Sequence, residues 1–194
     1  MIHDQLKGRH LILASESPRR QFLLKELGLD FEICPLNVSE VYPEGLQPEA
    51  IARYLAQLKA GHFDTSRLKD NTILITADTI VSVNGEILGK PSDPVSAAGM
   101  LKKLSGRKHE VITAVCLKSK TKIRVFHALT TVTFKKLSDS EITYYIDHFR
   151  PYDKAGSYGV QEWIGYIGIA HIDGSFFNVM GLPVKELYEE LLLF

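Results

Sequence analysis

A long β-branched segment in the middle of the chain constrains its fold most. Residues 71–83 are rich in Ile, Thr and Val and lead into an Asn84-Gly85 pair, which is the strongest short signal for a hairpin turn. We therefore expect a strand over 71–83 that pairs with a short strand over 86–88. A strand of this kind needs at least one covered face, and the segments around it supply helices for that purpose.

The rest of the chain alternates strands with helices. Apolar or β-branched runs predict further strands over 9–14, 31–35, 111–118 and 123–134. Helical spacing and end signals predict helices over 18–27, 48–60, 94–104, 139–149 and 183–192. The sequence contains no repeat and no flexible linker, so we expect one α/β domain over 1–194, with a mixed, twisted sheet flanked by helices. The middle hairpin and the long strands are expected to form a second lobe of that single elongated sheet.

Charge and composition exclude several kinds of partner. Basic and acidic residues number 23 each, so the chain has no net charge and no general attraction to nucleic acid or to an anionic membrane. No apolar run approaches the roughly 18 residues of a membrane span, and no signal-peptide pattern is seen, so we expect a cytoplasmic protein. Cys34 and Cys116 lack metal-type spacing and are expected to be reduced, buried thiols.

The run over 13–20, LASESPRR, combines a strand end with a helix start. Ser17 and Pro18 are typical of an N-cap and first helical position, and Arg19 and Arg20 follow directly. The backbone N–H groups of a helix N-terminus, together with guanidinium donors, suit phosphate or carboxylate. The alternative is an ordinary helix start with solvated arginines.

Four other positions carry groups that could do chemistry. Asp78 ends an apolar strand, where α/β sheets usually bind ligands, and is either a base or metal ligand or a carboxylate that caps a turn. Lys90 lies in a tight turn beside a proline, as a ligand contact or as simple surface charge. Gln161 ends a glycine-containing loop that can approach a ligand closely, and Glu40 is either a solvated loop residue or a cation ligand.

Familiar catalytic motifs are missing from the sequence. It contains no Gly-x-x-x-x-Gly-Lys-Ser/Thr loop, no Gly-x-Gly-x-x-Gly and no His-Glu-x-x-His, which excludes a Walker-type ATPase, a conventional dehydrogenase and a zinc protease. The seven histidines have no acid and nucleophile partners at a recognisable spacing, so we interpret them as structural or surface residues.

Six blocks together resemble the Maf family of nucleoside triphosphate pyrophosphatases, in the order seen there. They are LASESPRR (13–20), ADTIV (77–81), LGKP (88–91), LSGRKHEV (104–111), DKAGSYGVQ (153–161) and NVMGLP (178–183). The resemblance implies an elongated α/β fold similar to that of inosine triphosphate pyrophosphatases, with two lobes around a cleft. It also implies hydrolysis of a nucleoside triphosphate to the monophosphate and diphosphate, by water attack on the α-phosphorus with Mg²⁺ or Mn²⁺.

The same resemblance implies roles for individual residues. Asp78 would be the proton acceptor, although a carboxylate bound to a metal ion is a poor base and the two roles compete. Glu40, with Asp78, would hold the metal. The phosphate contacts would be Ser15, Arg20, Lys59 and Lys90. Many relatives have an acidic residue directly before the position of Glu40, where this chain has Ser39, so weaker metal affinity is expected.

Three positions indicate which nucleotide is used. Arg19, Thr79 and Gln161 resemble the branch of the family that acts on dTTP and UTP, whereas the branch that acts on 7-methylguanosine triphosphate typically has Trp, Gln and Glu there. A Gln amide both donates and accepts, which suits the carbonyl and N–H edge of uracil or thymine. Modified pyrimidine nucleotides are further candidate substrates.

One alternative function stays open at this stage. The family is also associated with inhibition of septum formation, so the chain could be a nucleotide-binding regulator of cell division with little turnover. The terminal apolar stripe around Leu187 and Leu191 is expected to be core or a contact within a homodimer.

Overall fold

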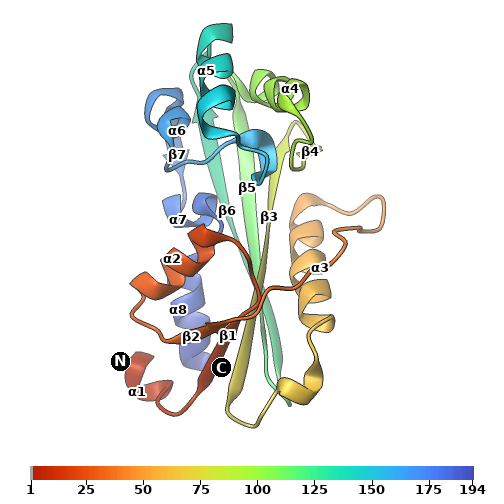
Figure 1. The fold of residues 1–194 in the computed structure, drawn as a ribbon, viewed down its shortest axis with the longest axis vertical. Helices are drawn as coiled ribbons and strands as arrows, with labels where there is room; N and C mark the ends of the chain where they lie inside the picture. The colour runs from red at the N-terminus through yellow and green to blue at the C-terminus, as the bar shows by residue number, and fades with distance from the viewer. Residues whose placement is uncertain (1) are drawn as a thin grey trace. The chain divides into compact units, whose positions relative to one another are not determined.

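The computed structural model describes residues 2–194, and within them seven strands form one mixed sheet flanked by helices (Figure 1). The strand order is β2-β1-β3-β5-β6-β7, and β4 pairs with β3. The strands are β1 His10–Leu13, β2 Phe31–Ile33, β3 Thr72–Val83, β4 Glu86–Leu88, β5 Lys108–Lys118, β6 Ile123–Phe134 and β7 Ile169–Asp173. This arrangement confirms the expected α/β class.

The helices agree with most of the predicted segments. They are α1 Ile2–Gln5, α2 Pro18–Glu26, α3 Pro48–Gly61, α4 Pro94–Leu104, α5 Asp139–Phe149, α6 Trp163–Gly168, α7 Phe176–Met180 and α8 Val184–Leu193. Two short 3₁₀ turns, η1 Thr65–Arg67 and η2 Ala155–Ser157, complete the set. Capping boxes start α4, from Asp93, and α5, from Ser138, so local hydrogen bonds fix both starts.

Pairing within the sheet follows the hydrophobic pattern. β1 runs parallel to both of its neighbours, with Leu11 opposite Phe31 on one side and opposite Ile73 on the other. The predicted hairpin is present, because β4 pairs antiparallel to β3 across Asn84 and Gly85, which have φ values of 50° and 80°. β7 pairs antiparallel to β6.

The described chain divides into two compact units. The first unit contains residues 2–78, 113–128 and 181–194, and the second contains 79–112 and 129–180. In the first unit, α3 lies on one side of β1 and β3, and α8 lies on the other side (Figure 1). In the second unit, α4 packs against α5 and against η2. The cleft between two lobes that the resemblance implies stays a prediction.

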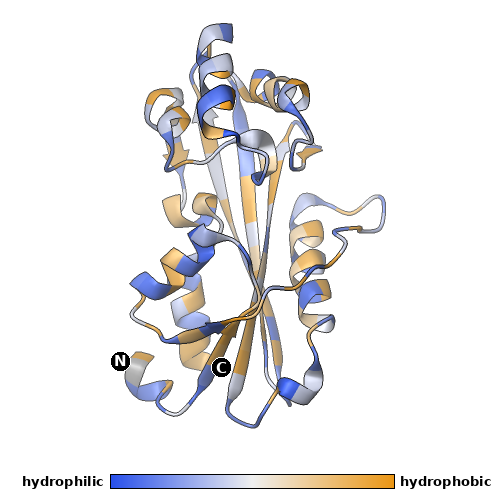
Figure 2. Cartoon of the chain, in the orientation of Figure 1, coloured by the Kyte–Doolittle hydropathy of each residue, from blue (hydrophilic) through white to orange (hydrophobic). Residues whose placement is uncertain are grey.

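Each unit has its own apolar core. Fully buried side chains of the first unit include Leu13, Leu24 and Ile75, and Figure 2 shows β1 as largely hydrophobic. Large buried side chains of the second unit include Phe134 and Tyr145. Each such side chain contributes about 1.5–3 kcal/mol by its removal from water. Leu187 and Leu191 are buried as well, which confirms a core role for that part of the terminal stripe.

Some predictions about local structure were wrong. Ser17 occupies the N-cap of α2, but its side chain makes no capping hydrogen bond. Pro183 is the N-cap of α8 rather than its first residue. Both cysteines are free, as expected, yet only Cys116 is buried; Cys34 is half-buried and its Sγ accepts a hydrogen bond from Arg67 Nη1 at 2.8 Å. The sequence patterns also did not predict α1, α6, β7 and α7.

None of the helices described over 2–194 is both long and apolar enough to cross a membrane.

Candidate active site

The loop that leads from β1 into α2 is fixed by hydrogen bonds to Ser15. The Ser15 hydroxyl is buried and accepts from the Ser17 backbone N–H at 3.2 Å. Gln21, one turn into α2, donates from Nε2 to the Ser15 carbonyl at 3.2 Å. The helix start is therefore organised by Ser15 and Gln21, and not by the Ser17 side chain that the sequence favoured.

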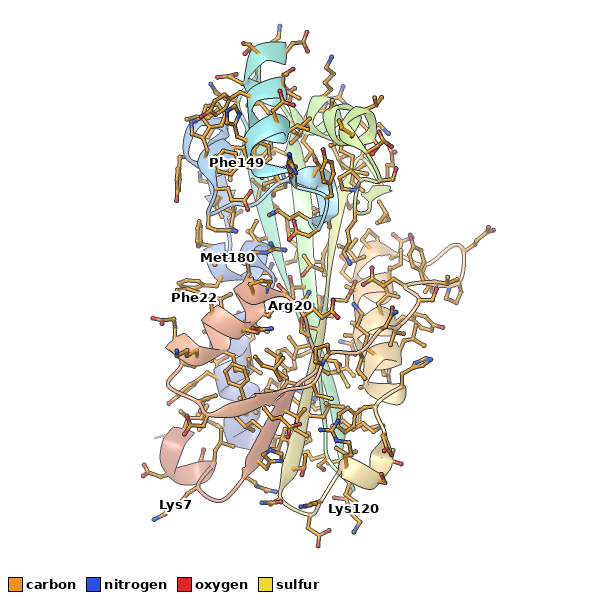
Figure 3. The ribbon with its side chains drawn as sticks, viewed as in Figure 1. Lys7, Arg20, Phe22, Lys120, Phe149 and Met180 are labelled. Atoms are coloured by element: carbon orange, nitrogen blue, oxygen red, sulfur yellow. The ribbon has the colours of Figure 1, made fainter. Side chains whose placement is uncertain are left out.

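Arg20 connects this helix start to two other segments of the same unit. Figure 3 labels Arg20 at the start of α2. Its Nε donates to the Gly181 carbonyl at 2.8 Å, and its Nη1 donates to the Ala77 carbonyl at 2.9 Å and lies 3.5 Å from Ser15 Oγ. Burial is the main cause that lowers the pKa of Arg20, and the nearby Asp78 carboxylate opposes it. The guanidinium is thus a positive charge fixed beside the middle of β3. The prediction that Asp78 ends this strand was wrong, because β3 continues to Val83.

Asp78, Lys59 and Glu40 form a chain of charges next to Arg20. Lys59 Nζ lies 2.9 Å from Glu40 Oε1 and makes a short contact with Asp78 Oδ1. Asp78 is the inner end, since its side chain is 8% exposed, and Glu40 is the outer end at 38%. Two carboxylates therefore converge on one cation, and one of them faces solvent.

A buried hydrogen bond sets the register that makes this contact possible. Thr76 Oγ1 donates to the Ala56 carbonyl of α3 at 2.6 Å, and both residues are fully buried. Asp78 lies two residues beyond Thr76 and so on the same face of β3, while Lys59 lies three residues beyond Ala56 on the same face of α3. The Thr76 bond therefore aligns helix and strand so that Lys59 reaches Asp78.

The remaining predicted residues, Thr79, Lys90 and Gln161, lie in the second unit. Thr79 is half-buried on β3, and Lys90 is exposed on the loop after β4. That loop is joined to the 153–161 segment, because the Gly156 N–H donates to the Gly89 carbonyl at 3.1 Å. The Gln161 Oε1 atom is buried and has no hydrogen-bond partner among the described residues.

Gly156 shows why the 153–161 segment needs glycine. Its φ is 68°, and a Cβ there would lie 2.9 Å from Cγ1 of Val81 on β3. The loop backbone therefore lies directly against the strand that carries Thr79 two residues earlier.

The first unit brings together five predicted residues through hydrogen bonds, ion pairs and charge interactions: Ser15, Arg20, Glu40, Lys59 and Asp78. Arg19 is half-buried beside Arg20 at the start of α2. Sequence reasoning missed three residues that support this cluster: Gln21, Thr76 and Gly181. Only the glycine in the NVMGLP block gave any signal; the polar side chains of Gln21 and Thr76 look ordinary in a helix and a strand.

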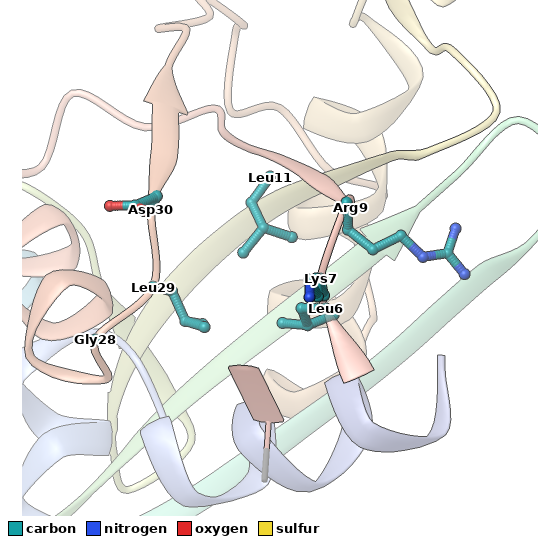
Figure 4. A pocket seen from close by; sticks show the side chains of 8 residues that line it. Leu6, Lys7, Arg9, Leu11, Gly28, Leu29 and Asp30 are labelled. Atoms are coloured by element: carbon teal, nitrogen blue, oxygen red, sulfur yellow. The ribbon is translucent and has the colours of Figure 1, made fainter. Parts of the chain in front are cut away.

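A cavity of about 310 Å³ lies elsewhere in the first unit (Figure 4). It is lined by the loop between α1 and β1, including Lys7 and Arg9, and by Leu29 and Asp30 after α2. None of the predicted site residues lines it, so it is separate from the charged cluster.

The chemistry of Glu40 and Asp78 fits a hard divalent cation, since both supply carboxylate oxygens within reach of a single positive group. Residues 2–194 contain no group of three or more His, Cys, Asp or Glu side chains arranged around one metal position. A metal held here would therefore take its other ligands from water and from the substrate, as Mg²⁺ commonly does.

Comparisons with known proteins match nearly the whole chain. The family model described as "Maf-like protein" matches residues 10–194. A dTTP/UTP pyrophosphatase of Porphyromonas gingivalis strain ATCC 33277 is 53% identical over 190 residues, covering 97% of this chain and 96% of that protein. Proteins of the same name from Flavobacterium psychrophilum and Phocaeicola vulgatus are 50% and 51% identical, covering 99% and 97% of this chain and 98% and 97% of their own lengths.

Among solved structures, the Ham1 protein of Staphylococcus aureus matches with a TM-score of 0.48 and 16% identity. The match covers 65% of this chain and 72% of that one.

Proposed function

This chain belongs to the Maf family, and from that premise we propose that it hydrolyses dTTP and UTP to the nucleoside monophosphate and diphosphate. The observation that carries the proposal is the cluster in which Lys59 contacts both Asp78 and Glu40 beside the half-buried side chain of Arg20. This cluster combines a carboxylate for proton transfer with positive charge for a triphosphate. Relatives that are about half identical over nearly the whole chain carry the name of that activity.

Asp78 is the proton acceptor in this proposal. The oxygen of water bonds to the α-phosphorus, the bond from that phosphorus to the bridging oxygen breaks, and the diphosphate leaves with the electron pair. The proton of the attacking water passes to the Asp78 carboxylate. Its low exposure supports this role, because a shielded carboxylate keeps its proton-accepting oxygen aimed at one place.

Phosphate binding is assigned to Ser15, Arg20, Lys59 and Lys90. The first unit supplies the N-terminus of α2 with Ser15 and Arg20, and backbone contacts to Ala77 and Gly181 orient the guanidinium before any ligand arrives. Lys90 in the second unit is exposed and is assigned by its place in the LGKP block.

Glu40 and Asp78 would hold Mg²⁺ or Mn²⁺, and this role of Asp78 competes with its role as proton acceptor, because a carboxylate bound to a metal ion is a poor base. The bound ion would neutralise charge on the phosphates and lower the pKa of a bound water. Ser39 offers no second carboxylate from this loop, so the protein ligands are few. Lys59 already neutralises the same two carboxylates, and a divalent cation must share them with it or displace it.

Nucleotide choice is assigned to Arg19, Thr79 and Gln161. The buried Oε1 of Gln161 has no hydrogen-bond partner among the described residues. This supports the assignment, because a ligand donor such as the N3–H of uracil or thymine would supply the missing hydrogen bond. A cytoplasmic location and a homodimer stay predictions from the sequence.

The test is a panel of canonical and modified nucleoside triphosphates incubated with the purified chain and Mg²⁺ or Mn²⁺, with diphosphate release as the readout. We expect the highest kcat/KM with dTTP and UTP. Saturable binding of these nucleotides without diphosphate release would favour the alternative of a nucleotide-binding regulator of cell division.

A further inference from the structure

Glu162, directly after Gln161, makes contacts that the proposed reaction does not use. Glu162 occupies the N-cap of α6, yet its carboxylate does not cap that helix. One oxygen, Oε2, accepts a short hydrogen bond from the Tyr145 hydroxyl of α5, and the other, Oε1, lies 3.0 Å from Lys154 Nζ. The Lys154 and Glu162 side chains are 8% and 19% exposed, so this ion pair is largely shielded from solvent.

The same tyrosine holds the start of the turn. The Gly159 N–H donates to Tyr145 Oη at 3.0 Å, and the Glu162 N–H donates to the Gly159 carbonyl at 3.0 Å. A Cβ at Gly159 would lie 2.7 Å from the carboxylate carbon of Glu162. Residues 159–162 therefore form a hydrogen-bonded turn. The Tyr145 hydroxyl contacts its first residue through the Gly159 N–H and its last residue through the Glu162 carboxylate.

The phenol is a permanent donor to this carboxylate. Burial is the main cause that raises the pKa of Tyr145, and the hydrogen bond to Glu162 and its charge raise that pKa further. A protonated Tyr145 can therefore donate to Glu162 and accept from Gly159 at any physiological pH.

The shielded ion pair of Lys154 and Glu162 is an inefficient way to stabilise the fold, because its burial removes two charges from water. A fully connected polar network does fix one conformation of the segment that carries it. The segment here is the turn that carries Gln161. We propose that Tyr145 and Glu162, with Lys154 as counter-charge, are positioning residues that hold the Gln161 amide in one orientation and so set the choice between pyrimidine bases.

The inference rests on the proposed function, in which Gln161 meets the base edge. Uracil and thymine present an N–H donor at N3 and a carbonyl acceptor at position 4, whereas cytosine presents an acceptor at N3 and an amino donor at position 4. An amide fixed in one orientation pairs with one of these donor and acceptor patterns and rejects the other. An amide that can flip, and so exchange its oxygen and nitrogen, accepts both.

The experiment compares Tyr145→Phe and Glu162→Gln with matched controls of the same chemistry, Tyr144→Phe and Glu110→Gln. Tyr144 is 44% exposed on the same helix, and Glu110 is exposed on β5. The readout is the ratio of kcat/KM for UTP to kcat/KM for CTP. We expect this ratio to fall about tenfold in the two test variants and to stay unchanged in the controls.

A second readout does not depend on turnover. Hydrogen exchange of the Gly159 amide should speed up in Tyr145→Phe, because its acceptor is gone, and should not change in Tyr144→Phe. Gly159→Ala provides a variant that removes no polar group: the new Cβ displaces the Glu162 carboxylate, so the UTP to CTP ratio should fall there as well.

A double-mutant cycle with Gln161→Ala separates positioning from a structural effect. If Tyr145 acts through Gln161, Tyr145→Phe should not lower the ratio further in the Gln161→Ala background. An equal fall in both backgrounds, or an unchanged ratio in Tyr145→Phe, would overturn the positioning role. If the wild-type chain hydrolyses no triphosphate, the proposed function fails, and the positioning role is then decided by exchange alone, where unchanged protection at Gly159 would overturn it.

Discussion

At the scale of single residues, Asp78 carries the most chemistry. Asp78→Asn keeps the size of the side chain and its place beside Lys59, but it removes the proposed proton acceptor. We expect kcat for UTP to fall by roughly 10² to 10⁴ with little change in melting temperature. Steady-state kinetics and circular dichroism melts provide the measurement, and near-normal turnover in the folded variant would contradict the assignment.

In the proposed metal site, Lys59 would compete with a divalent cation, because its Nζ contacts both carboxylates that would hold the metal. Lys59→Met removes that charge and keeps most of the side-chain length. We expect calorimetric titration with Mn²⁺ to show affinity increased about tenfold, equivalent to about 1.4 kcal/mol. Turnover should fall, since a proposed phosphate contact is lost.

The matched control for this titration is Lys25→Met, an exposed lysine at the end of α2 in the same unit. It should leave Mn²⁺ affinity unchanged. Weaker binding of Mn²⁺ by Lys59→Met would show that the lysine does not compete for these carboxylates.

The sequence identified the residue types of the site better than their contacts. Arg20 follows from a helix start, which is a local signal, whereas Asp78 was predicted at a strand end and lies within β3. The contact between Lys59 and Asp78 spans 19 residues and depends on how α3 packs on β3, so periodicity alone could not reveal it. The support that Gln21 gives to Ser15 spans only six residues and was missed because Gln21 looks like an ordinary polar residue of a helix.

At the scale of elements, local hydrogen bonds explain which predictions succeeded. Capping boxes at Asp93 and Ser138, and the turn at Asn84 and Gly85, act within a few residues, and the corresponding helices and hairpin were all predicted. α6 and β7 have no such signal. A Cβ at Gly165 would lie 1.9 Å from the Val160 carbonyl, so that helix depends on close backbone approach, which a sequence pattern does not reveal.

The alignment of α3 on β3 depends on Thr76. Thr76→Val keeps the shape of the side chain but loses the donor to the Ala56 carbonyl. We expect a loss of about 1 kcal/mol in the free energy of unfolding. We also expect kcat to fall, because Lys59 loses its register with Asp78. Urea unfolding and steady-state kinetics measure the two effects.

Thr76→Ser is the matched control, since it keeps the hydroxyl and loses only a methyl group. It should cost stability through packing while retaining most of the turnover. Equal losses of turnover in the Val and Ser variants would contradict the alignment role of this hydrogen bond.

At the scale of the whole molecule, the second unit contains a polar pair within its core. His109 is 2% exposed, its Nε2 lies 2.7 Å from Tyr158 Oη, and its ring packs edge-on against Phe134. Among the described residues, its Nδ1 has no hydrogen-bond partner. Burial lowers the pKa of His109 to about 4, so the ring is neutral in the folded protein near pH 7.

This burial makes stability depend on pH in a definite direction. Between about pH 6.5 and pH 4, unfolded chains bind a proton at His109 and folded chains do not, so acid favours unfolding. The stabilisation is complete above pH 6.5, and about 3 kcal/mol of it is lost by pH 4. Other groups titrate in the same range, and a variant is therefore needed to isolate this one.

His109→Phe should separate the effect of the hydrogen bond to Tyr158 from the effect of charging a buried imidazole. At pH 7 the variant should be less stable by about 1–3 kcal/mol, because the buried Tyr158 hydroxyl loses its partner. Between pH 6.5 and pH 4 its free energy of unfolding should fall less steeply than that of the wild type, since no buried imidazole is left to charge. Urea unfolding followed by the fluorescence of Trp163, the single tryptophan, reports on the unit that contains the pair.

His171→Phe, at an exposed position on β7, should keep the wild-type pH dependence. A His109→Phe variant that lost stability as steeply as the wild type would mean that other groups govern the response to acid.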